Sequence, residues 1–178
     1  MTTTAPSITL AHLVATGKES FLMAQAQGQF FFPKILCAFG DGRPEPLQVA
    51  QYEGEFDSLI EALSYLAAEG PIEWLAITSD SYEMTGSLTE YDPLVRSVLA
   101  GEQRLQDLFE DEHPSVTEAL QVVLVVRNKG SEHASLPYTR RGNKIVWTNP
   151  ANINTAARSF GQVEQAVSAA IEASHVQA

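Results

Sequence analysis

One segment constrains the fold more than any other, the run LQVVLVV from Leu120 to Val126. Six of its seven residues are apolar and four are β-branched valines, a composition typical of a β-strand. Side chains alternate between the two faces of a strand, so this strand is apolar on both faces. The chain therefore has to build a sheet that holds this strand in its interior and is covered on each side.

The remaining segments supply the partners of this strand. Apolar residues at helical spacing predict four helices, with Gly17 dividing the first into two, at 8–26, 57–69, 92–109 and 154–174. Apolar and β-branched runs bounded by turn residues predict five further strands at 30–39, 47–52, 72–78, 134–139 and 144–148. Pro33 lacks a backbone donor, so the first strand either lies at an edge or begins after the proline.

The order of these elements favours an α+β fold. The strands come largely as neighbouring hairpins, and the alternation of strand and helix that builds parallel sheets is incomplete. We expect a single mixed or mostly antiparallel sheet of about five to six strands with helices packed on it, and a parallel α/β fold is the alternative. The length of 178 residues fits one globular domain over 1–178.

Composition limits where the protein works. No apolar run approaches the roughly 18–20 residues that span a bilayer, so neither a transmembrane helix nor another membrane association is expected. The start, MTTTAPS, has no basic residue and leads into no apolar stretch of the kind found in signal peptides. The only cysteine, Cys37, lies in an apolar run and is expected to be a small buried side chain. These features predict a cytoplasmic protein.

Charge is unevenly distributed. The formal net charge is −11, and residues 41–118 hold 18 acidic against three basic side chains, whereas residues 119–178 hold six basic and three acidic ones. An acidic segment repels nucleic acid, so direct binding of DNA or RNA is not expected. The same segment would attract a basic partner, imitate a phosphate backbone, or simply keep the protein in solution.

The stretch LAITSDSYEM (75–84) places polar side chains directly after a buried strand. A carboxylate pair, Asp80 and Glu83, would serve as acid and base or as metal ligands, with Tyr82 between them. Strand alternation gives the plainer interpretation, which we favour: the strand continues outward, with Asp80 and Tyr82 on one face and Glu83 on the other.

A basic hairpin near the C-terminus is the best candidate for binding a small ligand. Arg140, Arg141 and Lys144 would hold a phosphate or carboxylate, with Arg127 and Lys129 expected nearby. Two aromatic side chains of the same hairpin, Tyr138 and Trp147, would stack on a base. Alternatively, these cations pair with the acidic middle of the chain, or they protect an exposed sheet edge from aggregation.

No motif specifies a reaction. The four histidines are scattered without metal-ligand spacing, and the chain lacks G-x-S-x-G, Walker A and G-x-G-x-x-G sequences. We therefore predict no cofactor and no metal site, and the sequence leaves open whether the protein is an enzyme. The succession of TSDSYEM, an acidic stretch and EALQVVLVV resembles the layout of small uncharacterised bacterial and phage proteins and implies no activity.

Three hypotheses for function follow. The first is a non-enzymatic interaction protein that self-associates or binds a protein partner through residues 90–118, with Glu110, Asp111 and Glu112 in contact. The second is a protein or enzyme for an anionic or nucleotide-like ligand, held by the 138–147 hairpin together with Asp80 and Glu83; it requires Asp80 within about 15 Å of Arg140. The third is an acidic mimic of nucleic acid.

Overall fold

A computed structural model describes residues 7–49, 56–84, 92–148 and 162–176. The helices in these ranges are α1 (Leu10–Ala26), α2 (Phe56–Glu69), α3 (Pro93–Leu99), α4 (Leu105–Glu110) and α5 (Gln162–Val176). The strands are β1 (Lys34–Phe39), β2 (Leu47–Val49), β3 (Ile72–Met84), β4 (Val116–Val126), β5 (Gly130–Arg141) and β6 (Lys144–Trp147). The parts of the predicted elements at 50–52 and 154–161 lie outside the described residues.

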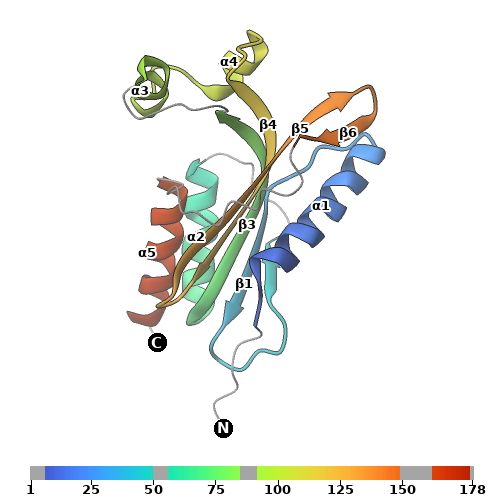
Figure 1. Ribbon diagram of the computed structural model, residues 1–178. Coiled ribbons are helices and arrows are strands. Elements are labelled where there is room, and N and C mark those ends of the chain that lie inside the picture. Colours follow the sequence, from blue (N-terminus) through green and yellow to red (C-terminus); the bar gives the residue numbers. More distant parts are fainter. Residues whose placement is uncertain (1–6, 50–55, 85–91, 149–161, 177–178) are drawn as a thin grey trace.

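The six strands form one sheet in the order β2-β1-β3-β4-β5-β6, and every neighbouring pair is antiparallel (Figure 1). This confirms the predicted α+β fold. Because β4 lies between β3 and β5, the apolar run at 120–126 occupies the interior of the sheet, as its composition predicts.

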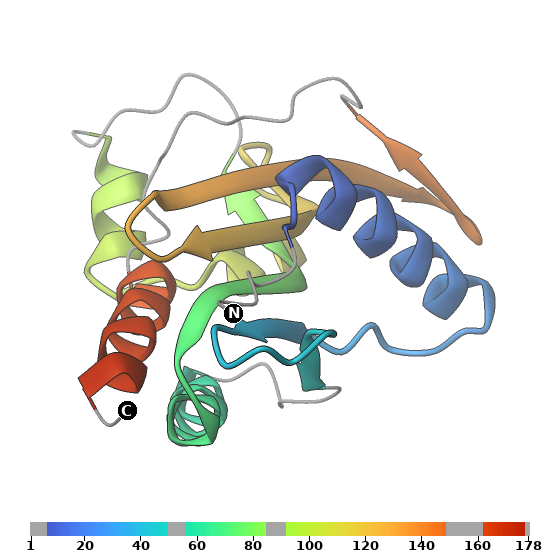
Figure 2. The ribbon, with the colours of Figure 1, turned by 90° about the horizontal axis from the view of Figure 1, so that it is seen from below.

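Helices cover both faces of the sheet (Figure 2). Helix α1 packs on one face, against Leu120, Val122 and Leu124 of β4. Helices α2 and α5 pack on the opposite face, against Val123 and Val125. Each of these five side chains of β4 is at most 5% exposed. Their alternation between two separate cores is the direct consequence of a strand that is apolar on both faces.

Helix α1 continues through Gly17, so the prediction of two short helices is wrong. Gly17 is buried against the sheet, where an added Cβ would lie 3.1 Å from Thr78 Cγ2. The glycine lets the helix backbone approach β3. Packing against the sheet offsets the roughly 1 kcal/mol by which glycine disfavours a helix relative to alanine.

The single helix predicted over 92–109 is also wrong, because two short helices occupy this range. Asp92 caps α3 by accepting a hydrogen bond from the Leu94 amide, and Pro93 stands in the first turn. After α3, Gly101 adopts a φ of +73°, the left-handed conformation that commonly ends a helix. The chain therefore turns before α4 begins at Leu105.

The stretch LAITSDSYEM is strand throughout. Strand β3 pairs residue by residue with β4 as far as Met84 opposite Val116. Its apolar part, up to Thr78, is buried, and its polar part is half-buried. The interpretation of the polar residues as an outward continuation of the strand is confirmed.

Cys37 is fully buried, as predicted, and burial raises the pKa of its thiol to about 12. Within the described ranges, no helix has both the length and the apolar character needed to cross a membrane.

Candidate functional site

The structure brings two of the predicted ligand-binding segments together. Asp80 of β3, Glu118 of β4 and Tyr138 and Arg140 of β5 lie side by side on the α1 face of the sheet; we call these four residues the Arg140 network. The Tyr138 hydroxyl donates to Asp80 at 2.6 Å, and it lies 3.3 Å from Glu118. Arg140 Nε donates to Glu118 Oε1 at 3.0 Å, and its Nη2 lies 3.7 Å from Asp80 Oδ2.

Strand register explains this meeting. Tyr82 stands opposite Glu118, and Glu118 stands opposite Tyr138 on the next strand. Asp80 and Arg140 are each two residues from these positions, so all point to the same face. The 15 Å requirement of the small-ligand hypothesis is therefore met, but the guanidinium of Arg140 already contacts two carboxylates of the same chain.

Helix α1 covers this network. The Gln25 side-chain oxygen accepts a hydrogen bond from Arg140 Nη1, and the ring of Phe21 lies 5.1 Å from Tyr138 and 5.9 Å from Trp147. Tyr138 is 1% exposed. Tyr138 therefore presents no free face for stacking on a base. Trp147 is half-buried, and Lys18 Nζ lies 4.7 Å from the centroid of its ring.

Burial sets the protonation of the network. It raises the pKa of the Asp80 carboxyl above its usual range, while the hydrogen bond from Tyr138 opposes this shift. Burial also raises the pKa of Tyr138, and the neighbouring Asp80 adds to the effect. Tyr138 is therefore a hydrogen-bond donor at neutral pH and not a general base.

The other predicted ligand-binding residues do not belong to the Arg140 network. Glu83 lies on the opposite face of the sheet, where it accepts a hydrogen bond from Ser135, and burial raises the pKa of its carboxyl. Tyr82 packs on Phe109 of α4, with ring centroids 5.0 Å apart. Arg141 and Lys144 are exposed and stand opposite each other at the tip of the β5–β6 hairpin.

Arg127 and Lys129 do not lie near this hairpin tip, contrary to the prediction. They occupy the turn before Gly130, where β5 begins, whereas the tip follows Arg141, where β5 ends. A strand of this length places the two ends about 35 Å apart. Among the described residues, the basic side chains of the 127–129 turn and of the 140–144 hairpin tip therefore form no common site.

Most of the predicted acidic surface, residues 90–118, belongs to a projection that we call the acidic lobe, residues 93–113, which contains α3 and α4. Residues 90–91 lie outside the described residues, and Glu118 belongs to β4 and to the Arg140 network. It extends beyond the ends of β3 and β4 (Figure 1). The side chains of Glu110, Asp111 and Glu112 are all exposed. Beside them is an open hollow of about 440 Å³, lined by Phe109, Glu110, Glu112, His113 and Val116.

The acidic lobe holds its shape through contacts of its own. Leu108 is buried, and Phe109 packs on Tyr82 of β3, so α4 is fixed to the sheet. Arg104 pairs with Asp107 at 2.6 Å, and Gln106 Nε2 donates a hydrogen bond to Glu110 Oε1 at 2.9 Å. The acidic group at the end of α4 is otherwise exposed to solvent. The dipole of α4 does not stabilise these carboxylates, because negative charge is disfavoured at the C-terminus of a helix.

Sequence reasoning missed two members of the cluster around Arg140. Glu118 and Gln25 each contact Arg140, but neither was singled out. Glu118, the one charged residue of the largely apolar strand β4, was a usable signal, because a half-buried carboxylate requires a partner. The position of Gln25 depends on how α1 packs, and no local pattern predicts that.

No protein-family model, curated protein or solved structure matches this chain. Among the residues that the structure describes, no three histidine, cysteine, aspartate or glutamate side chains gather closely enough to hold a metal ion. The acidic lobe, the Arg140 network and the cavities are the features whose geometry bears on function.

Proposed function

We propose that this protein is a non-enzymatic, cytoplasmic interaction protein that binds a basic segment of a protein partner through the acidic lobe. One observation carries the proposal: the hollow beside α4 combines carboxylates at its rim with an apolar floor. Glu110 and Glu112 line the hollow and are exposed, so they stand at its rim. Phe109 is half-buried and Val116 is buried, so these two form its floor. Such a hollow suits an arginine or lysine side chain, whose long apolar stem and charged head need both kinds of surface.

The apolar floor favours a protein partner over the two alternatives. Mimicry of nucleic acid requires carboxylates spaced like phosphates, and a phosphate backbone has no counterpart to the ring of Phe109. A small-ligand site at the Arg140 network would require Arg140 to give up Glu118 and Asp80, both of which it contacts. The nucleic-acid mimic therefore stays a prediction from the charge of the acidic segment, and the small-ligand site stays a prediction from the proximity of Asp80 to Arg140.

Fluorescence anisotropy with a labelled peptide tests the proposal. The probe contains arginines separated by alanines, and the matched control peptide replaces each arginine with citrulline, which keeps the shape and removes the charge. We expect the arginine peptide to bind more tightly, with an affinity that falls as salt is raised, because exposed charges are screened. The combined variant Glu110→Lys, Asp111→Lys and Glu112→Lys should weaken binding at least tenfold.

A second charge-reversal variant separates local contact from net charge. Glu61, Glu69 and Glu132 are exposed and lie outside the acidic lobe. Their replacement by lysine changes the net charge by the same amount and should leave most of the binding intact. Equal losses in the two variants would show that the peptide senses only the overall charge, and unchanged binding in the lobe variant would exclude the lobe as the contact surface.

A further inference from the structure

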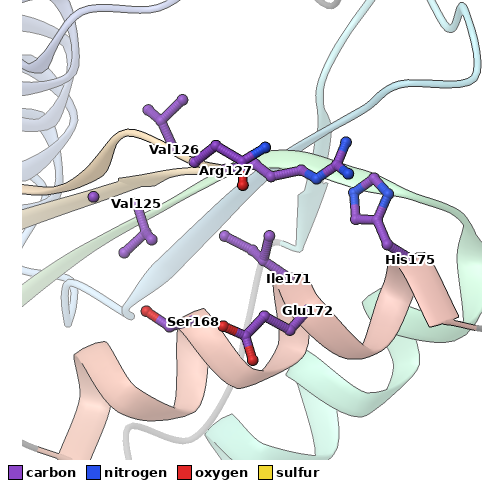
Figure 3. Close-up of a pocket in the computed structure, with 9 residues that line it drawn as sticks. Val125, Val126, Arg127, Ser168, Ile171, Glu172 and His175 are labelled. Atoms are coloured by element: carbon purple, nitrogen blue, oxygen red, sulfur yellow. The ribbon is translucent and has the colours of Figure 1, made fainter.

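A second cavity lies at the other end of the molecule from the acidic lobe. It has a volume of about 440 Å³, between the C-terminal half of α5 and the turn that joins β4 to β5. Figure 3 shows Ser168, Ile171, Glu172 and His175 of α5 facing Val125 and Arg127 at the end of β4. The volume is within the range of small-molecule sites in proteins.

Hydrogen bonds fix both walls of this cavity. The Ser174 hydroxyl accepts from the Ile72 amide at 2.9 Å, and His175 Nε2 bonds the Ile72 carbonyl at 2.8 Å. The backbone amide and carbonyl of Ile72, the first residue of β3, are thus both bound by side chains of α5. The Arg127 amide donates to the Glu73 carbonyl at 2.9 Å, which ties the end of β4 to the same strand. A cavity with fixed walls spends little free energy on ordering when a ligand enters.

A cation stands at one end of the cavity. Arg127 Nη1 lies 3.1 Å from Glu73 Oε1, and this ion pair orients the guanidinium beside the ring of His175 (Figure 3). Glu73 engages a single nitrogen of the guanidinium. The other nitrogens make no hydrogen bond to a described residue, so donors remain for a carboxylate.

A carboxylate stands at the other end. The Glu172 side chain points back along α5 toward Ser168, one helical turn earlier, as the tilt of helical side chains toward the N-terminus favours (Figure 3). Within the described part of the chain, no cation lies at ion-pair distance from Glu172. Glu172 and the Ser168 hydroxyl together suit an ammonium group, which donates to oxygen acceptors.

Apolar side chains line part of the cavity between its two charged ends. Ile171 and Val125 are at most 5% exposed and form its floor. The guanidinium of Arg127 lies beside His175 (Figure 3), and from the Ser168–Glu172 pair to His175 the helix advances by about 5–10 Å. The charges of Glu172 and Arg127 are therefore separated by several bond lengths. We propose that this cavity binds a short aliphatic zwitterion, with its ammonium on Glu172 and Ser168, its methylene chain on Ile171 and Val125, and its carboxylate on Arg127.

The probe that tests this proposal is 5-aminopentanoate, whose four methylenes separate an ammonium from a carboxylate. We expect saturable shifts of the backbone amide signals of 125–130 and 168–175 in ¹H–¹⁵N spectra, with a dissociation constant on the order of 1 mM for a ligand of this size. Pentanoate and pentylamine, which each keep one charge, should bind at least tenfold more weakly. Valine, an isomer of the probe with adjacent charges, should also bind at least tenfold more weakly.

Two variants assign the ends of the ligand. Glu172→Gln should weaken 5-aminopentanoate about tenfold and leave pentanoate unchanged, because pentanoate has no ammonium. Arg127→Gln should weaken 5-aminopentanoate and leave pentylamine unchanged. The control variant is Glu132→Gln, an exposed carboxylate outside the cavity, and it should change nothing. Because Glu172 is itself exposed, its replacement leaves the fold intact and the test stays valid.

Several results would overturn the proposal. These are the absence of saturable shifts at 20-fold the expected dissociation constant, equal binding of pentanoate or valine, or shifts that map to the acidic lobe. The Lys substitutions at 110–112 should have no effect on this titration, so failure of the zwitterion site and failure of the proposed function are distinguishable.

Discussion

The Arg140 network and the acidic lobe both gather charged side chains, but they differ in what those side chains contact. In the network, Arg140 contacts the carboxylates of Asp80 and Glu118, which are 23% and 14% exposed. In the lobe, the carboxylates of Glu110 and Glu112 are exposed around a hollow. Charges that find partners within the chain contribute to the fold, whereas exposed charges beside an apolar hollow are available to another molecule. Changes in the network should therefore alter stability, and changes in the lobe should alter binding.

The largest expected effect is on the network. Tyr138→Ala removes a ring that is 1% exposed and that packs on Phe21 and Trp147, and it should cost about 3–5 kcal/mol in the free energy of unfolding. Tyr138→Phe keeps the ring and removes only the donor to Asp80, and it should cost about 1–2 kcal/mol. Urea denaturation measures both. A Phe variant as stable as the wild type would show that the hydroxyl contributes nothing to the network.

The Asp80 carboxyl should make the stability of the protein depend on pH. The pKa of Asp80 is raised in the folded protein, so protonation of Asp80 favours folding. This contribution is fully present below the ordinary aspartate pKa and is lost as the pH rises through the raised folded value. Asp80→Asn should therefore flatten the dependence of stability on pH in the mildly acidic range, measured by urea denaturation at several pH values.

Glu83 provides the matched comparison for this pH effect. It lies on the same strand and also has a raised pKa, but its partner is the hydroxyl of Ser135 on the opposite face. Glu83→Gln should flatten the same curve independently, and the double variant should show additive changes because the two carboxylates share no partner. For the Asp80→Asn variant, a steeper dependence of the free energy of unfolding on pH would contradict the prediction. It would mean that Arg140 and Tyr138 lower the folded pKa of Asp80 below its unfolded value.

The fold could be predicted from the sequence to the extent that local patterns decide it. The apolar run at 120–126 sufficed to predict an interior strand, because a side-chain period of two requires no knowledge of distant residues. The two glycines show where this reasoning stops. Gly17 lies within a helix because packing on Thr78 favours a close approach, whereas Gly101 follows a helix end in a left-handed conformation. Tertiary contact decided between these outcomes.

The candidate sites required still more of the tertiary structure. Strand alternation predicted that Asp80 and Glu83 point to opposite faces, and the structure agrees. The pairing of Asp80 with Arg140 depended on the register of three strands, which the sequence does not specify. The cavity that contains Arg127 and Glu172 depended on the position of α5 against the sheet, and no motif marks these two residues.

The smallest expected effect on stability is in the acidic lobe, and it completes the comparison. The combined variant Glu110→Lys, Asp111→Lys and Glu112→Lys should change the free energy of unfolding by no more than about 0.5 kcal/mol, since exposed surface substitutions rarely do more. Any change should be toward greater stability, because lysine suits the C-terminal end of α4 better than glutamate does. Urea denaturation of this variant and of the Glu61, Glu69 and Glu132 variant gives the measurement and its control. A loss of 2 kcal/mol in the lobe variant alone would mean that these carboxylates have stabilising partners within the folded chain beyond the exposed hydrogen bond from Gln106 to Glu110, and the distinction between the network and the lobe would then fail.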